Sequence, residues 1–220
     1  MAPCATSGIV DIMDQDTLFS DSMRALVRIA AAVAGAPIAF TRRVMADAIG
    51  VAPAVAVDEV LLQSYLFAGF PRALNAMRVW REVSGELAPG ADVALLCETS
   101  AADLRLRGEE TCRTVYGQKY DALRHTVSRL HPALDAWMVT DGYGKVLSRP
   151  GLTLVQRELC IVAACAASEQ TPQLKSHLRG ARNCGATLED LAHTLSALTD
   201  IVTREALIAA REELNRIKES

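Results

Sequence analysis

Apolar residues recur every three to four positions along most of the chain, a spacing that is typical of amphipathic helices. Essentially no segment alternates apolar and polar residues with a period of two, as a half-buried strand would. The first clear apolar stripe lies in the helix expected from Ser22 onward and consists of Met23, Leu26, Val27, Ala30 and Val33. The pattern therefore predicts an all-α protein.

Glycine and proline residues divide this pattern into separate helices. Proline lacks a backbone donor and disfavours helix in the residue before it, and glycine is common just after a helix end. The segments 141–144 (DGYG) and 149–151 (RPG) have the composition of loops. Helices are expected over about 22–34, 38–48, 58–67, 72–83, 109–130, 133–140, 153–167, 173–183, 188–198 and onward to the C-terminus.

The two halves of the chain correspond when one is shifted by 135 residues. The shift brings Gly50 onto Gly185, and the alanine-rich helices before these glycines align without a gap. After a four-residue deletion in the second half, the helices that follow also correspond. We interpret this as the duplication of a helical unit that buries its faces against its own copy.

The correspondence divides the chain into an N-terminal arm (1–20), a first helical repeat (21–85), a connecting helical segment (86–150) and a second helical repeat (151–220). The two repeats differ in chemistry. Glu158 of the second repeat falls on Met23 of the first, and His177 falls on Arg42. The polar pair is therefore expected only in the second repeat, and the first repeat carries a degenerate site.

Composition and charge narrow the class of protein. Of the 220 residues, 36 are alanine and only 5% are aromatic, which favours closely packed helices. The net charge of −3 gives no general attraction to nucleic acid or to an anionic membrane. No segment reaches the roughly 18 apolar residues of a transmembrane helix, and the first residues do not resemble a secretory signal. The six scattered cysteines are therefore expected to be reduced thiols in a cytoplasmic protein.

The sequence gives no indication of a metal or of a nucleotide cofactor. The four histidines have neither HExxH spacing nor an i, i+4 pairing. No glycine-rich loop of the kind that binds phosphate is present in the sequence. We therefore expect a site without a metal and without a cofactor.

Several segments match a known family pattern in their order and spacing. They are 65–76 (YLFAGFPRALNA), 143–152 (YGKVLSRPGL), 157–159 (REL), 173–177 (QLKSH) and 185–190 (GATLED). Through these segments the chain resembles the carboxymuconolactone decarboxylase family. The resemblance implies a duplicated, all-α carboxymuconolactone decarboxylase/alkylhydroperoxidase-like fold. It also implies assembly into a ring, here a homo-oligomer formed by a trimer of two-repeat chains.

The family contains two chemistries, and this sequence lacks the residues of one of them. Thiol hydroperoxidases of the family carry cysteines 12 and 15 residues after a glutamate and a histidine 19 residues after it. Counted from Glu158, these places hold Gln170, Gln173 and His177. The peroxidase mechanism needs a nucleophilic thiolate and a second thiol, and both are missing from these places. The resemblance therefore favours the decarboxylase branch, in a form without the CxxC motif.

The resemblance implies a site in which His177 is the catalytic acid or base and Glu158 orients it. Decarboxylation also needs a cation for the substrate carboxylate, and arginine binds carboxylates in a bidentate manner. Arg149 and Arg157 are the residues expected to fill this role. The expected reaction is a cofactor-free decarboxylation, or related lactone chemistry, on a small carboxylated ring compound.

Two alternatives stay open at this point. Cys165 lies seven residues after Glu158, and Cys184 lies seven residues after His177, so each thiol shares a helix face with one member of the pair. The first alternative is therefore a thiol-dependent hydroperoxide reductase or redox protein. The second is a non-catalytic assembly protein on the same scaffold, whose sign would be the lack of a pocket between Glu158 and His177.

Overall fold

The computed structural model of the chain describes residues 18–90 and 99–218. All regular structure within these ranges is helical, which confirms the predicted all-α fold. Most of the expected N-terminal arm lies outside the described residues, and so does part of the break expected between residues 84 and 100.

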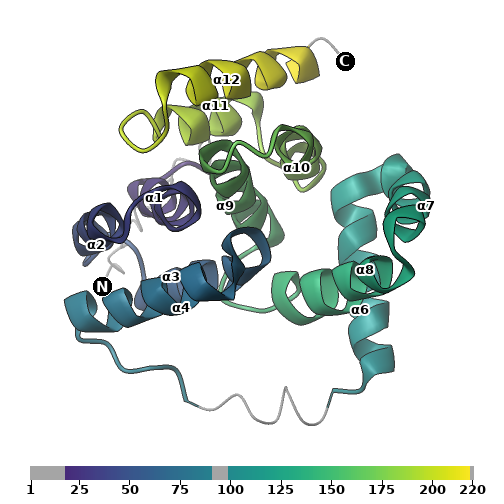
Figure 1. Cartoon of the computed structure of the whole chain (residues 1–220), viewed down its shortest axis with the longest axis horizontal. Coiled ribbons are helices and arrows are strands. Elements are labelled where there is room, and N and C mark those ends of the chain that lie inside the picture. The colour runs from purple at the N-terminus through teal and green to yellow at the C-terminus, as the bar shows by residue number, and fades with distance from the viewer. Residues whose placement is uncertain (1–17, 91–98, 219–220) are drawn as a thin grey trace, which may run out of the picture.

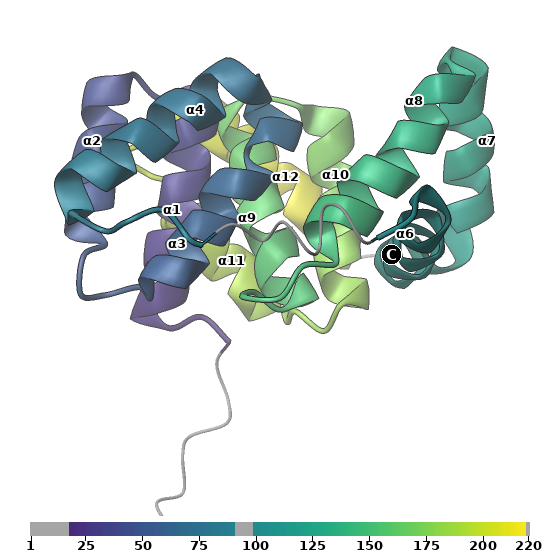
Figure 2. The ribbon, with the colours of Figure 1, turned by 90° about the horizontal axis from the view of Figure 1, so that it is seen from below.

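Short connections join most of the helices, and α7 and α8 project from one side of the helices that surround α9 (Figures 1 and 2). The elements are α1 (Asp21–Gly35), α2 (Ile38–Asp47), α3 (Ala54–Gln63), α4 (Tyr65–Ser84), α6 (Ala101–Tyr116), the 3₁₀ turn η1 (Gly117–Lys119), α7 (Tyr120–Leu130), α8 (Pro132–Trp137), the π-helix η2 (Met138–Leu147), α9 (Leu154–Ala167), α10 (Thr171–Asn183), α11 (Leu188–Ser196) and α12 (Arg204–Lys218).

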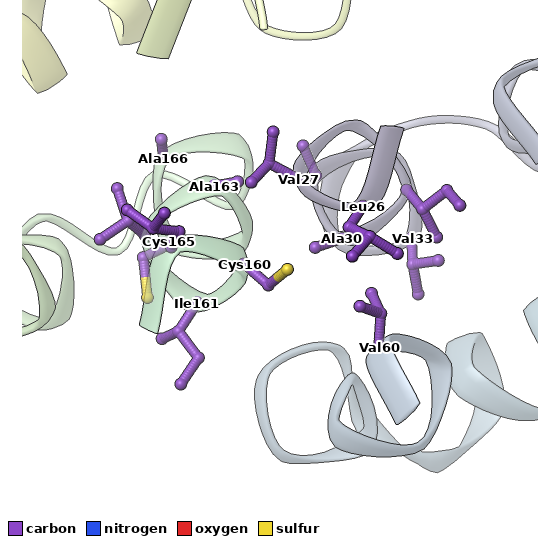
Figure 3. Packing of buried hydrophobic residues seen from close by; sticks show 14 of the residues in the cluster. Leu26, Val27, Ala30, Val33, Val60, Cys160, Ile161, Ala163, Cys165 and Ala166 are labelled. Carbon is purple, nitrogen blue, oxygen red and sulfur yellow. The ribbon is translucent and has the colours of Figure 1, made fainter. Parts of the chain in front are cut away.

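Helix α9 lies in the centre of the hydrophobic core, because nearly every side chain beyond its first turn is small or apolar and buried. Leu26 and Ala30 of α1 and Val60 of α3 belong to the same buried cluster, beside Cys160 of α9 (Figure 3). Cys165 lies on the side of α9 that faces away from α1 (Figure 3). The small side chains let the helix axes approach closely, which is how an alanine-rich sequence fills this core.

The helices of the two expected repeats follow one another in a corresponding order, with α1–α4 matching α9–α12 and α1 packed against α9. Gly50, after α2, and Gly185, after α10, have φ angles of 74° and 106°. These angles favour glycine, so both positions use it in the same way. The arrangement is compatible with duplication, which stays a prediction together with the division into four segments.

The loop predicted at residues 141–144 is wrong, because this segment belongs to the π-helix η2. Two glycines explain the difference. A Cβ atom on Gly144 would lie 2.0 Å from the backbone oxygen of Leu104, and one on Gly108 would lie 2.0 Å from that of Val139. The glycines therefore allow α6 and η2 to pack with their backbones in direct contact, which local composition does not reveal.

Other boundaries also differ from the sequence pattern. The helix predicted over 109–130 begins earlier, where Ser100 caps α6, and is divided at Gly117. The break expected between the helices over 58–67 and 72–83 is present at Gly69, whose φ of 79° and ψ of 160° interrupt the helical geometry of α4 (Tyr65–Ser84). The kink brings the rings of Tyr65 and Phe70 together, with their centroids 4.7 Å apart.

Substitution of Gly144 by alanine is expected to lower the free energy of unfolding by about 3 kcal/mol. A backbone oxygen cannot move aside as a flexible side chain can, so α6 and η2 would have to separate. The melting temperature should fall by about 6–12 °C. Gly142→Ala is the matched control, because a Cβ atom there meets nothing within 4 Å. Equal melting temperatures for the two variants would contradict the proposed close contact.

An ion cluster of Glu59, Arg149 and Arg157 joins the two halves of the chain. Nη2 of Arg157 donates to Glu59 Oε2 at 2.8 Å, and Nη2 of Arg149 donates to Glu59 Oε1 at 2.9 Å. Arg157 also donates to the backbone oxygens of Arg149 and Pro150, at 3.0 Å each. Because Glu59 lies on α3 and Arg157 on α9, the cluster fixes the two helices and the 149–151 loop relative to one another.

Candidate functional site

Glu158 on α9 and His177 on α10 form a buried pair. Nδ1 of His177 lies 2.8 Å from Oε2 of Glu158. The carboxylate is fully buried and the imidazole is 5% exposed. The other carboxylate oxygen, Oε1, has no hydrogen-bond partner within the described part of the chain. The contact with Glu158 leaves Nε2 as the ring nitrogen that is available to a ligand.

Local sequence signals position both members of the pair. Thr153 begins α9 with a capping box, in which its side chain and that of Gln156 satisfy each other's backbone donors. Pro172 stands in the first turn of α10, where proline is well tolerated. Gly180 lies one turn after His177, and a Cβ atom there would lie 2.7 Å from Glu158 Oε2. The glycine thus lets α10 pack directly over the carboxylate.

His177 lines a cavity of about 700 Å³. The lining comes from the first residues of α4, from α6, α7, α8 and η2, and from α10. For a non-catalytic assembly protein we expected no pocket at the Glu–His pair. The cavity beside His177 therefore argues against that alternative. The lining residues are Tyr65, Leu66, Phe67, Phe70, Tyr116, Leu123, Val127, Leu134, Trp137, Met138, Asp141, Gly142, Tyr143, Lys145, Leu147, Pro172, Gln173, Ser176 and His177.

Aromatic rings surround the imidazole of His177 at the wall of the cavity. The ring of Phe67 meets it edge-on at a centroid distance of 5.7 Å, and that of Tyr116 lies 6.4 Å away. The ring of Tyr143 meets that of Tyr116 edge-on, with their centroids 6.1 Å apart. Burial raises the pKa of Tyr116 to about 12 and that of Tyr143 well above its ordinary value. Both hydroxyls are therefore protonated at neutral pH and able to donate hydrogen bonds.

The cysteines considered for redox chemistry have an unfavourable environment. Burial, followed by the nearby charge of Glu158, raises the pKa of Cys165 and of Cys184 to about 12. Only on the order of one thiol in 10⁵ is then ionised at neutral pH. Neither residue lines the cavity, and both are free thiols. The environment therefore disfavours the nucleophilic thiolate that a peroxidase needs.

The arginines expected to bind the substrate lie elsewhere. Arg149 and Arg157 both pair with Glu59, and neither is among the residues that line the cavity. The structure therefore does not bring them together with His177. The cation in the lining is Lys145, whose Nζ lies 3.0 Å from Asp141 Oδ1.

Tyr116 and Lys145 line the cavity but are not among the site residues that the sequence predicts. Tyr116 is the last residue of α6 and lies outside the segments that carry the family resemblance given above. Lys145 lies within the segment 143–152 of the family resemblance, which assigns it no role. The described residues contain no group of three or more His, Cys, Asp or Glu side chains that could hold a metal ion.

In the first repeat, the positions that match the pair have other roles. Met23, which corresponds to Glu158, is buried in the hydrophobic core. Arg42, which corresponds to His177, pairs with Glu82 at the surface. The described residues thus have the Glu–His pair only in the second repeat.

Comparison with known proteins supports the family pattern. The sequence model of the Carboxymuconolactone decarboxylase family matches residues 132–215, which include Glu158 and His177. "Peroxisomal protein 2" of Schizosaccharomyces pombe (strain 972 / ATCC 24843) is 30% identical over 135 residues, which are 60% of this chain. The match spans 62% of the length of that relative, less than two thirds. None of the described helices is long and apolar enough to span a membrane.

Proposed function

We propose that the chain, whose residues 132–215 match the model of the carboxymuconolactone decarboxylase family, catalyses a cofactor-free decarboxylation, or related lactone chemistry, on a carboxylated compound. One observation carries the proposal. His177 lies at the wall of a large cavity, and a buried carboxylate holds its Nδ1 at 2.8 Å. A histidine oriented in this way can transfer protons through Nε2, with Glu158 stabilising the charged imidazolium.

The proposed reaction needs a substrate whose carboxylate is bonded to the carbon adjacent to a carbonyl carbon, as in a 3-oxo carboxylate. The bond between that adjacent carbon and the carboxylate breaks, CO₂ leaves, and the electron pair is delocalised into the carbonyl as an enolate. His177 then donates a proton from Nε2 to the carbon and is protonated again by water. Because the substrate's own carbonyl accepts the electron pair, the reaction needs no resident cofactor.

Tyr116 is proposed to donate a hydrogen bond to the enolate oxygen. Its ring lies beside that of His177 and packs edge-on against the buried ring of Tyr143, which fixes its position. A donor already in position stabilises a developing negative charge more than bulk water does, because it needs no reorientation during the reaction. Two further expectations stay predictions. They are the assembly of three two-repeat chains into a ring-shaped trimer, and the location of the protein in the cytoplasm.

The experiment measures CO₂ release in D₂O from a panel of carboxylated lactones and 3-oxo carboxylic acids. The expected result is catalysed release from at least one compound, with one deuterium on the carbon that carried the carboxylate. The deuterium reports proton delivery at that carbon. A folded protein that releases no CO₂ from any compound of the panel would contradict the proposal.

A further inference from the structure

The cavity beside His177 has extended apolar walls, which a small, highly charged acid would not contact. Helices α7 and α8 contribute only apolar side chains to the lining, namely Leu123, Val127, Leu134 and Trp137. The kinked start of α4 adds the ring of Phe70. Apolar surface of this kind contributes to affinity only when a ligand removes it from water.

The uncharged polar side chains of α10 form a strip next to His177. Gln173, Ser176 and His177 stand at positions i, i+3 and i+4, which share one face of a helix, and all three line the cavity. Elsewhere in the lining, Asp141 and Lys145 form an ion pair and compensate each other's charge. The lining therefore suits a ligand with one polar end, and offers little to balance a second carboxylate.

Large apolar side chains of the lining are also exposed to solvent. Phe70 is 63% exposed, Leu134 is 48% exposed and Trp137 is 61% exposed. Grouped exposed apolar side chains beside a pocket are typical of a binding site. The volume of about 700 Å³ is within the range of roughly 300–1,000 Å³ that holds ligands of drug size.

We propose that the substrate is a monocarboxylate with an extended apolar body, bound with its carboxylate at the α10 strip and its body against α7 and α8. The inferred position of the carboxylate depends on the proposed function. The inference of an apolar body depends only on the apolar residues that line the cavity. This substrate class is larger and less charged than the small ring compound expected from the sequence. A small dicarboxylate would leave the walls of α7 and α8 in contact with water.

Binding can be measured without turnover through tryptophan fluorescence. The chain has two tryptophans, of which Trp80 is buried in the core and Trp137 lines the cavity. The full chain is titrated with decanoate and, separately, with adipate, a small dicarboxylate. Decanoate is expected to shift the Trp137 emission to shorter wavelength with a Kd at least about tenfold below that of adipate. Comparable affinities, or no saturable change with decanoate, would overturn the proposal.

A pair of variants tests whether the wall of α8 binds the apolar body. Leu134→Asp is expected to weaken decanoate binding at least about tenfold, because it brings a charge into the apolar wall. Leu130→Asp is the matched control, since Leu130 is 73% exposed at the end of α7 and does not line the cavity. An unchanged affinity in Leu134→Asp would overturn the assignment of the wall.

The outcomes separate this proposal from the proposed function. Decanoate binding in a protein that decarboxylates no compound of the panel contradicts the proposed function and supports the binding of an apolar body. Efficient release of CO₂ from small ring dicarboxylates, without decanoate binding, contradicts the substrate class and leaves the proposed function standing.

Discussion

Replacement of His177 by alanine is expected to lower kcat about 10²–10⁴-fold, the usual contribution of a general acid or base. The loss follows because Nε2 of this residue is the proposed proton donor at the cavity wall. His177→Asn is made in parallel, since asparagine keeps a side-chain donor toward the buried carboxylate of Glu158. Turnover, circular dichroism and the melting temperature are measured for both variants.

The control for these variants is His125→Ala. His125 is exposed on α7 and does not line the cavity, so its loss should leave kcat within about twofold of the original value. A folded His177→Asn protein with undiminished turnover would show that the proton comes from another group.

Replacement of Glu59 by glutamine is expected to lower the free energy of unfolding by about 3–5 kcal/mol, because it leaves the buried charge of Arg157 without its counter-ion. The side chain of Arg157 has no exposed surface, and that of Glu59 is 9% exposed. Burial already lowers the pKa of Arg157, and the hydrogen bond that Arg157 donates to Glu59 opposes this shift. Glutamine keeps the size of the side chain, so the loss reports the charge and not a cavity.

Glu82→Gln is the matched control for this prediction. Glu82 pairs with Arg42 at the surface, where the two side chains are 49% and 46% exposed. Exposed pairs contribute about 0–1 kcal/mol, so this variant should unfold at nearly the original denaturant concentration. The prediction fails if urea unfolding gives the same free energy for Glu59→Gln as for the unchanged protein.

The sequence pattern predicted most helices because their ends depend on local signals. Gly50 and Gly185 follow helices, and Thr153 and Pro172 stand where α9 and α10 begin. The π-helix η2 could not be predicted in this way. Its glycines resemble a loop in composition, and the reason for one of them, the contact between Gly144 and the backbone of α6, appears only in the tertiary structure.

The contact within the Glu–His pair was predictable, because the spacing of the two residues carries the information. Glu158 and His177 stand 19 residues apart on successive helices, and the structure brings them into contact. The partners of the arginines were not predictable, because Glu59 lies 90 and 98 residues before Arg149 and Arg157. An arginine that suits a substrate carboxylate suits a buried glutamate equally well, and the tertiary structure decides between them.

The cavity walls could not be inferred from the sequence at all. They combine side chains of α4, α7, α8 and η2, and each of these helices has an apolar face for which a place in the core is an equally good explanation. Only the packing of these helices leaves Leu134 and Trp137 partly exposed beside the pocket rather than buried.

Chemical rescue of His177→Ala by imidazole tests the central claim most directly. The substitution leaves a space next to the cavity, in which a small base can take the place of the missing side chain. We predict that imidazole restores turnover in a saturable manner, by at least about tenfold, and only while Glu158 is present to orient it. A His177→Ala protein that is fully active without imidazole, or that imidazole does not rescue while the fold is intact, would contradict the claim that His177 transfers the proton.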